Sequence, residues 1–153
     1  MKYWLMKTEP GTFSFEDLQK SKNKTTQWEG VRNYQARNFM RDDMKIGDGI
    51  LFYHSVVKPM AVMGIAKVSR EAYPDHFAFD SKSSYHDPKS SKENPCWFMV
   101  DIQYVRSFNP PLTLEEMKNI KGLKNMELLK KGNRLSIQPV SEKEWNLIEE
   151  LRP

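Results

Sequence analysis

Apolar and polar residues divide the chain into short segments with two different periods. Alternation, or a short apolar run between turn residues, predicts five strands, at residues 3–7, 50–55, 61–68, 97–108 and 136–140. Apolar residues three and four positions apart predict helices that begin after Ser14, Asn33, Thr113 and Ser141, residues that favour the N-cap position. A further short helix is expected over residues 125–130. Because strands and helices alternate irregularly, we expect the α+β class, with a small mixed or antiparallel sheet that could curl into a barrel.

Glycine, proline and polar runs add local detail to this pattern. Gly64 lies inside a predicted strand and indicates a bulge or a close backbone approach. Pro110 and Pro111 are expected to end the longest strand. Residues 20–26 are interpreted as a solvated polar loop, and residues 73–95 as a long loop of the kind that is often functional or mobile.

Length, charge and cysteine content narrow the class of protein. The 153 residues fit one domain, which we place at residues 1–153. A net charge of +4 permits a polyanionic partner but does not require one. The single Cys96 excludes an internal disulfide framework and favours a reducing, intracellular location. Without a membrane-spanning run or a signal peptide, we expect a cytoplasmic protein in a bacterium or a nuclear one in a eukaryote.

The standard catalytic patterns are absent from the sequence. His54, His76 and His86 lack metal-ligand spacing, and no glycine-rich phosphate loop or serine nucleophile elbow occurs. We therefore expect no metal and no cofactor. Cys96 has no activating base near it in sequence and is interpreted as an inert thiol.

Residues 28–41, WEGVRNYQARNFMR, are the most informative segment. Arginine, asparagine and glutamine form paired hydrogen bonds to base edges, and an unstacked base can lie on tryptophan or tyrosine. Arg32 and Arg37 are candidates for phosphate contacts. The alternative interpretation is an amphipathic helix with a solvated polar face and a tryptophan in the core.

Two other places carry polar groups at strand ends. Lys7, Thr8 and Glu9 could act as acid and base, form an exposed ion pair, or bind a ligand without reacting. Residues 53–55, Tyr-His-Ser, form a second polar and aromatic group, for which a buried and hydrogen-bonded role is the alternative.

Long runs of this sequence resemble the EVE-domain family. The matching runs include YWLMKTEPGTFSFEDL, WEGVRNYQARNFMR, GDGILFYHS, YHDPKS and LLKKGNRLSIQPVSEKEW, in order over nearly the whole chain. The resemblance implies a PUA-like fold, a small curled β-barrel with helices around it. It also implies a non-catalytic module that binds nucleic acid through a modified base, with modified cytosine in DNA favoured over RNA.

The resemblance implies a base-binding pocket with Trp28 as the first choice of stacking surface. Its residues, transferred position by position, are Lys7, Glu9, Trp28, Gly30, Val31, Asn33, Tyr34, Arg37, Tyr53, His54, Ser55, Arg134 and Ser136. Three positions depart from the family pattern. Val56 replaces a common asparagine, Met60 interrupts a common Pro-Gly pair, and Cys96 replaces a common arginine.

Two other function classes stay open. ASCH relatives of the same fold imply a hydrolase that acts on a modified nucleoside with Lys7, Thr8 and Glu9. Consecutive strand residues alternate between faces, which argues against all three reaching one substrate. The third class is a protein-interaction adaptor.

Overall fold

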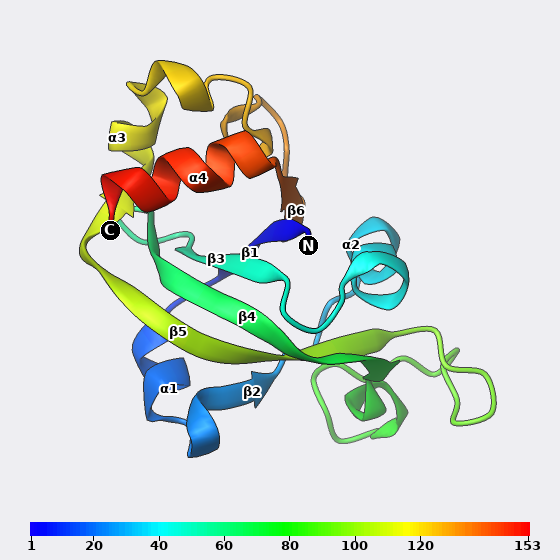
Figure 1. Cartoon of the computed structure of the whole chain (residues 1–153). Coiled ribbons are helices and arrows are strands. Elements are labelled where there is room, and N and C mark those ends of the chain that lie inside the picture. The colour runs from blue at the N-terminus through cyan, green and yellow to red at the C-terminus, as the bar shows by residue number, and fades with distance from the viewer.

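The computed structural model describes residues 1–153 and contains one open six-stranded sheet (Figure 1). Its order is β2-β5-β4-β3-β1-β6. The strands are β1 (Tyr3–Thr8), β2 (Thr25–Gln27), β3 (Gly49–His54), β4 (Ala61–Pro74), β5 (Phe98–Thr113) and β6 (Ile137–Val140). β1 pairs in parallel with β3, and every other pairing is antiparallel, so the sheet is mixed. The α+β prediction is confirmed. No helix is long and apolar enough to span a membrane.

Four α-helices begin where capping residues predict. They are α1 (Phe15–Lys20), α2 (Tyr34–Asn38), α3 (Leu114–Lys118) and α4 (Glu142–Leu151). Ser14, Asn33, Thr113 and Ser141 each accept a backbone N–H of the first turn through their side chains. α2 continues into a wider π-helical turn, Phe39–Asp43. Short 3₁₀ turns span Lys22–Lys24, His76–Phe79, Lys121–Leu123 and Glu127–Leu129, the last within the helix expected at 125–130.

Core side chains lie on both faces of the central strands. In β1, Trp4 and Met6 join the cluster that contains α1 and α2 residues, while Leu5 joins the cluster that contains α3 and α4 residues. Trp145 and Ile148 of α4 are buried in that second cluster, and Leu151 is partly buried. Because successive strand residues point to opposite faces, β1 and β3 hold the two clusters together.

Three expectations about strands are corrected or confirmed. Pro110 and Pro111 lie inside β5 rather than ending it, because the β4 register jumps from Gly64↔Ser107 to Val62↔Leu112 and β2 pairs only with residues 101–103, so no ladder hydrogen bond is needed from either proline. Residues 20–26, which we expected to be a loop, contain two of the three residues of β2. β4 continues to Pro74, beyond the end predicted at residue 68. The register against β5 shifts between Val62 and Gly64, which confirms the bulge.

Candidate functional site

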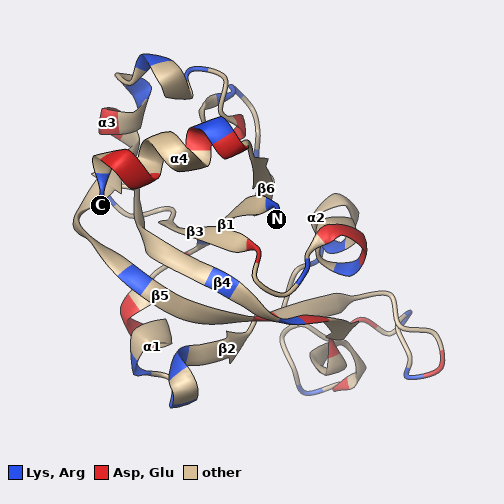
Figure 2. Cartoon of the chain, viewed as in Figure 1, with Lys and Arg blue, Asp and Glu red and all other residues tan.

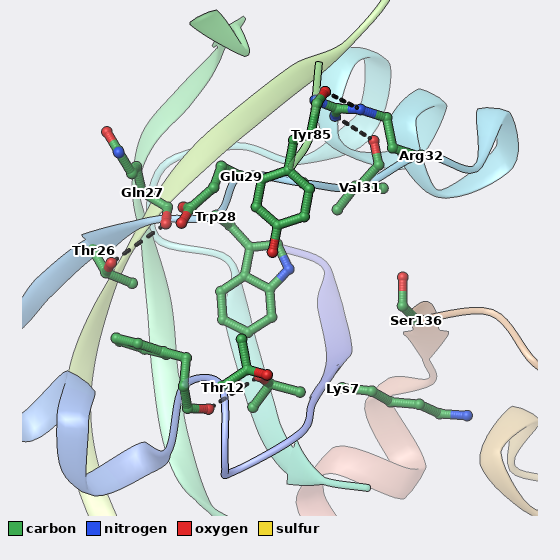
Figure 3. A pocket seen from close by; sticks show the side chains of 13 residues that line it. Lys7, Thr12, Thr26, Gln27, Trp28, Glu29, Val31, Arg32, Tyr85 and Ser136 are labelled. Atoms are coloured by element: carbon green, nitrogen blue, oxygen red, sulfur yellow. Dashed lines mark hydrogen bonds between the residues drawn. The ribbon is translucent and has the colours of Figure 1, made fainter. Parts of the chain in front are cut away.

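A pocket of about 240 Å³ opens where four segments that are distant in sequence meet (Figure 3). The end of β1 and the turn after it form one part, and residues 26–32 form another. Single residues come from the long loop and from the segment before β6. The lining residues are Lys7, Thr8, Thr12, Phe13, Thr26, Gln27, Trp28, Glu29, Gly30, Val31, Arg32, Tyr85 and Ser136.

Backbone hydrogen bonds bring these segments together. The Lys7 N–H donates to the Ser136 carbonyl at 2.8 Å and extends the β1–β6 pairing. The Trp28 N–H donates to the Val100 carbonyl at 2.8 Å and keeps the chain beside β5 after β2 ends. The Thr8 hydroxyl donates to the Phe13 carbonyl at 3.0 Å and closes the turn. The pocket is therefore built on the sheet rather than on free loops.

Trp28 forms the centre of the pocket. Its indole packs against Phe52 in the core, with ring centroids 5.6 Å apart and planes at 88°. Figure 3 shows Lys7 and Ser136 on one side of the indole and Thr26, Gln27 and Glu29 on the other. Trp28 is half-buried, so the core supports the ring while part of it faces the pocket.

Asp75 organises the rim opposite β1. Its fully buried carboxylate accepts from the Gly30 N–H at 2.9 Å and from the Arg32 guanidinium at 3.0 Å. The same guanidinium donates to the Tyr85 carbonyl through Nε at 3.2 Å and Nη2 at 2.6 Å. Asp75 thus holds Gly30 directly and Tyr85 through Arg32.

Gly30 lets the Tyr85 ring approach the backbone. A Cβ at position 30 would lie 2.6 Å from two atoms of that ring, closer than carbon atoms pack. Gly30 also has a φ of +84°, in the left-handed region that glycine adopts without strain. Both observations favour glycine at position 30, where the backbone and the Tyr85 ring together form one wall of the pocket.

Lys7 and Glu29 are charged pocket residues without an ion-pair partner. Burial lowers the pKa of the Lys7 ammonium. Burial raises the pKa of the Glu29 carboxyl, and the nearby Asp75 charge raises it further. Both groups are partly desolvated and available to a ligand that supplies an acceptor for one and a donor for the other.

Five residues from the predicted site line the pocket: Lys7, Trp28, Gly30, Val31 and Ser136. Glu9 is exposed in the turn, where its carbonyl accepts the N–H groups of Thr12 and Phe13. Arg134 is exposed and does not line the pocket.

The other predicted residues lie elsewhere. Asn33 caps α2, and Tyr34 and Arg37 lie beside Trp97. Tyr53 is buried in the core, and burial raises its pKa to about 12. His54 accepts the Phe15 N–H at 3.0 Å through Nε2, and burial lowers its pKa. Ser55 donates to the Thr8 carbonyl at 3.3 Å.

Sequence reasoning did not place several pocket residues in the site. They are Thr8, Thr12, Phe13, Thr26, Gln27, Glu29, Arg32 and Tyr85. Arg32 was a candidate phosphate contact, but most of its contacts are with Asp75 and Tyr85. Glu29 stands between two predicted site residues, and that position was the available signal. Tyr85 belongs to the long loop, whose length alone indicated a functional segment.

Comparisons with known proteins agree over nearly the whole chain. The EVE domain family matches residues 2–151. Chicken thymocyte nuclear protein 1 is 45% identical over 95% of this chain and 66% of its own length, so the chain spans about two thirds of that relative.

Solved structures share the fold. A hypothetical protein from Leishmania major has a TM-score of 0.91 and 47% identity, covering 99% of this chain and 94% of that one. Human THYN1 protein in complex with DNA containing 5-methylcytosine has a TM-score of 0.91 and 42% identity, covering 99% and 97% of the two chains. These similarities confirm the expected fold class.

Proposed function

The chain belongs to the EVE-domain family, and on that premise we propose that it binds DNA by holding one modified cytosine in the Trp28 pocket. A base must leave its stack to enter such a pocket. The human relative in complex with DNA containing 5-methylcytosine supports this choice of ligand. The proposed module binds the base without reacting with it.

The half-buried Trp28 at the centre of the pocket is the observation that carries the proposal. A base stacked on an aromatic side chain contributes about 1–3 kcal/mol to binding. The pocket volume of about 240 Å³ lies below the range of roughly 300–1,000 Å³ typical for drug-sized ligands. This size fits a single base better than a longer stretch of strand.

The polar groups around Trp28 include the donor and acceptor types that the edge of cytosine requires. A carboxylate accepts from the exocyclic amine of cytosine, and Glu29 offers one without an ion-pair partner. The Lys7 ammonium and the Ser136 hydroxyl are donors for the ring nitrogen and carbonyl of the base. Thymine would present a carbonyl where cytosine presents the amine, and would leave Glu29 without a donor.

Charge contributes less to this binding than the pocket does. Figure 2 shows acidic and basic residues interspersed along the chain rather than gathered on one element. With a net charge of +4, we expect few phosphate contacts and a shallow dependence of affinity on salt. Unmodified DNA should therefore bind weakly.

Titration of matched duplexes tests the proposal, with one position as cytosine or as 5-methylcytosine. The wild-type chain should prefer the methylated duplex. Trp28→Ala should weaken that binding roughly 5- to 150-fold, the equivalent of about 1–3 kcal/mol. Ile46→Ala is the control, because this exposed side chain does not line the pocket. Equal affinity for both duplexes would refute recognition of the methyl group.

A hydrolase finds less support in the geometry. Lys7 and Thr8 line the pocket, but Glu9 does not, so the proposed acid of the three-residue group lies outside it. Incubation with modified cytidines, followed by mass spectrometry, separates the two functions. Turnover that is lost in Lys7→Ala would replace the non-catalytic proposal.

A further inference from the structure

Tyr34 is the one phenylalanine, tyrosine or tryptophan whose side chain is largely exposed, at 60%. It is the first residue of α2 and does not line the Trp28 pocket. A single exposed apolar side chain is ordinary, but an exposed flat ring held beside other aromatic rings and a cation is suited to stacking with a base. The neighbours of Tyr34 therefore decide whether it can bind a ligand.

Trp97 fixes the orientation of Tyr34. The two rings stack with centroids 4.8 Å apart and planes at 23°. Trp97 itself is buried, and its indole N–H donates to the Asp87 carboxylate at 2.6 Å. The inner face of Tyr34 is thus held against a rigid partner.

The Arg37 guanidinium contacts both rings, and the Tyr34 side chain stays 60% exposed beside it. Its guanidinium carbon is 4.8 Å from the Tyr34 centroid and 5.9 Å from the Trp97 centroid. A guanidinium on the outer face of Tyr34 would be about twice as far from Trp97 as from Tyr34, because the rings are stacked. The observed distances place it beside the stack instead.

Arg37 also retains hydrogen-bonding capacity. Three of its N–H groups donate, two to the Asn38 side-chain oxygen and one to the Cys96 carbonyl. A guanidinium has five such donors, so two stay available to a phosphate. Tyr34 and Arg37, which we call the platform, therefore combine a flat ring with an adjacent fixed positive charge.

Arg32 connects this platform to the pocket. Its guanidinium carbon lies 5.3 Å from the Trp97 centroid and 5.7 Å from the centroid of Tyr85, which lines the pocket. Val31 of the pocket and Tyr34 are three residues apart, so their Cα atoms are separated by at most ~11 Å. The backbone of one strand advances ~3.4 Å or more per nucleotide, so a nucleotide that neighbours the bound one can lie beside Tyr34.

We propose that Tyr34 and Arg37 form a second nucleic-acid site, in which a base that flanks the bound one stacks on the outer face of Tyr34 and its phosphate pairs with Arg37. The ring tolerates any base, because every base has a flat face. This platform contributes affinity along the strand, whereas the pocket distinguishes the modification. The inference rests on the proposed nucleic-acid function but assigns these two residues a role outside the pocket.

The experiment compares ligands that reach one site or both. Binding of 5-methyl-2′-deoxycytidine and of a short oligonucleotide with one central 5-methylcytosine is measured for wild type, Tyr34→Ala, Tyr34→Phe and Trp28→Ala. Tyr34→Ala should weaken oligonucleotide binding about tenfold and leave nucleoside binding unchanged. Tyr34→Phe keeps the ring and should retain most of the affinity. Because Tyr34 is exposed, its variants should melt close to wild type, which thermal unfolding checks.

Each other outcome identifies which proposal fails. Unchanged oligonucleotide binding in Tyr34→Ala overturns the platform. Equal losses for nucleoside and oligonucleotide also overturn it, because Tyr34 would then act through the pocket. If Trp28→Ala has no effect while Tyr34→Ala weakens binding, the pocket proposal fails and the platform stands. If no oligonucleotide binds the wild type, both proposals are wrong.

Discussion

Arg32 donates to the fully buried carboxylate of Asp75 at 3.0 Å, and the same guanidinium donates to the carbonyl of Tyr85. One ion pair therefore fixes both the backbone at Gly30 and the loop that carries Tyr85. The pocket wall depends on a single acidic side chain that does not itself line the pocket.

Asp75→Ala should destabilise the protein by about 3 kcal/mol, because it leaves the Arg32 guanidinium and the Gly30 N–H without their acceptor. Asp75→Asn keeps an acceptor for an N–H but loses the charge, and should lose less. Urea unfolding of the three proteins measures both differences. If Asp75→Ala unfolds at the wild-type midpoint, the ion pair does not stabilise the wall.

Gly30→Ala should reduce both stability and binding. The left-handed φ costs roughly 1–2 kcal/mol for a residue with a Cβ, and the new Cβ would displace the Tyr85 ring. Gly47→Ala is a matched control, since Gly47 has a φ of +92° but open space around its Cα. Both variants should lose stability, and only Gly30→Ala should also lose affinity for methylated DNA. Equal affinity in the two variants would show that the Tyr85 position has no effect on binding.

Local signals predicted the elements well because their physical causes are local. The caps at Ser14 and Ser141 work through hydrogen bonds within one helical turn, so their spacing is visible in the sequence. The ends of β4 and β5 were less predictable. Pro110 is tolerated because residues 108–111 of β5 have no partner in β4 or in β2, and this depends on strands that are distant in sequence.

The site was only partly predictable for the same reason. Lys7 and Ser136 meet through a β1–β6 bond that no local pattern reveals. Tyr53 and His54 resemble pocket residues in composition, but both faces of β3 are covered, so the first is buried in the core and the second binds the start of α1. Polar and aromatic character predicts a functional residue only where the fold leaves that face open.

Glu29→Gln should stabilise the free protein at about neutral pH. Burial raises the pKa of Glu29 in the folded state above its ordinary value of 4.5. Between the unfolded-state pKa and the folded-state pKa, the folded chain therefore binds more protons than the unfolded chain. Stability linked to Glu29 is therefore complete below the unfolded pKa and is lost as pH rises through the folded one.

Denaturant unfolding across this range measures the effect. The difference between Glu29→Gln and wild type should grow in favour of the variant as pH rises from about 4 to about 7, while methylated DNA should bind the variant less well. Glu93→Gln, at an exposed position whose side chain forms no ion pair, is the control and should show no such trend. A constant difference across the range would contradict the burial argument.

Val56→Asn should stabilise the protein by about 1 kcal/mol. Val56 has a φ of 71°, a conformation that is strained for a β-branched residue and that asparagine adopts more easily. Its side chain is 72% exposed, so the substitution removes little apolar burial. The positive φ at this position thus explains why asparagine is common there in the family.

Val57→Asn separates backbone strain from surface polarity. Val57 is also exposed, at 40%, but its φ is not positive, so asparagine should bring no gain there. Val56→Gly also relieves the strain but gives the unfolded chain more freedom, and should gain less than Val56→Asn. Urea midpoints in the order Val56→Asn, Val56→Gly, wild type would support the strain explanation. An equal gain in Val57→Asn would instead assign the effect to the loss of exposed apolar surface.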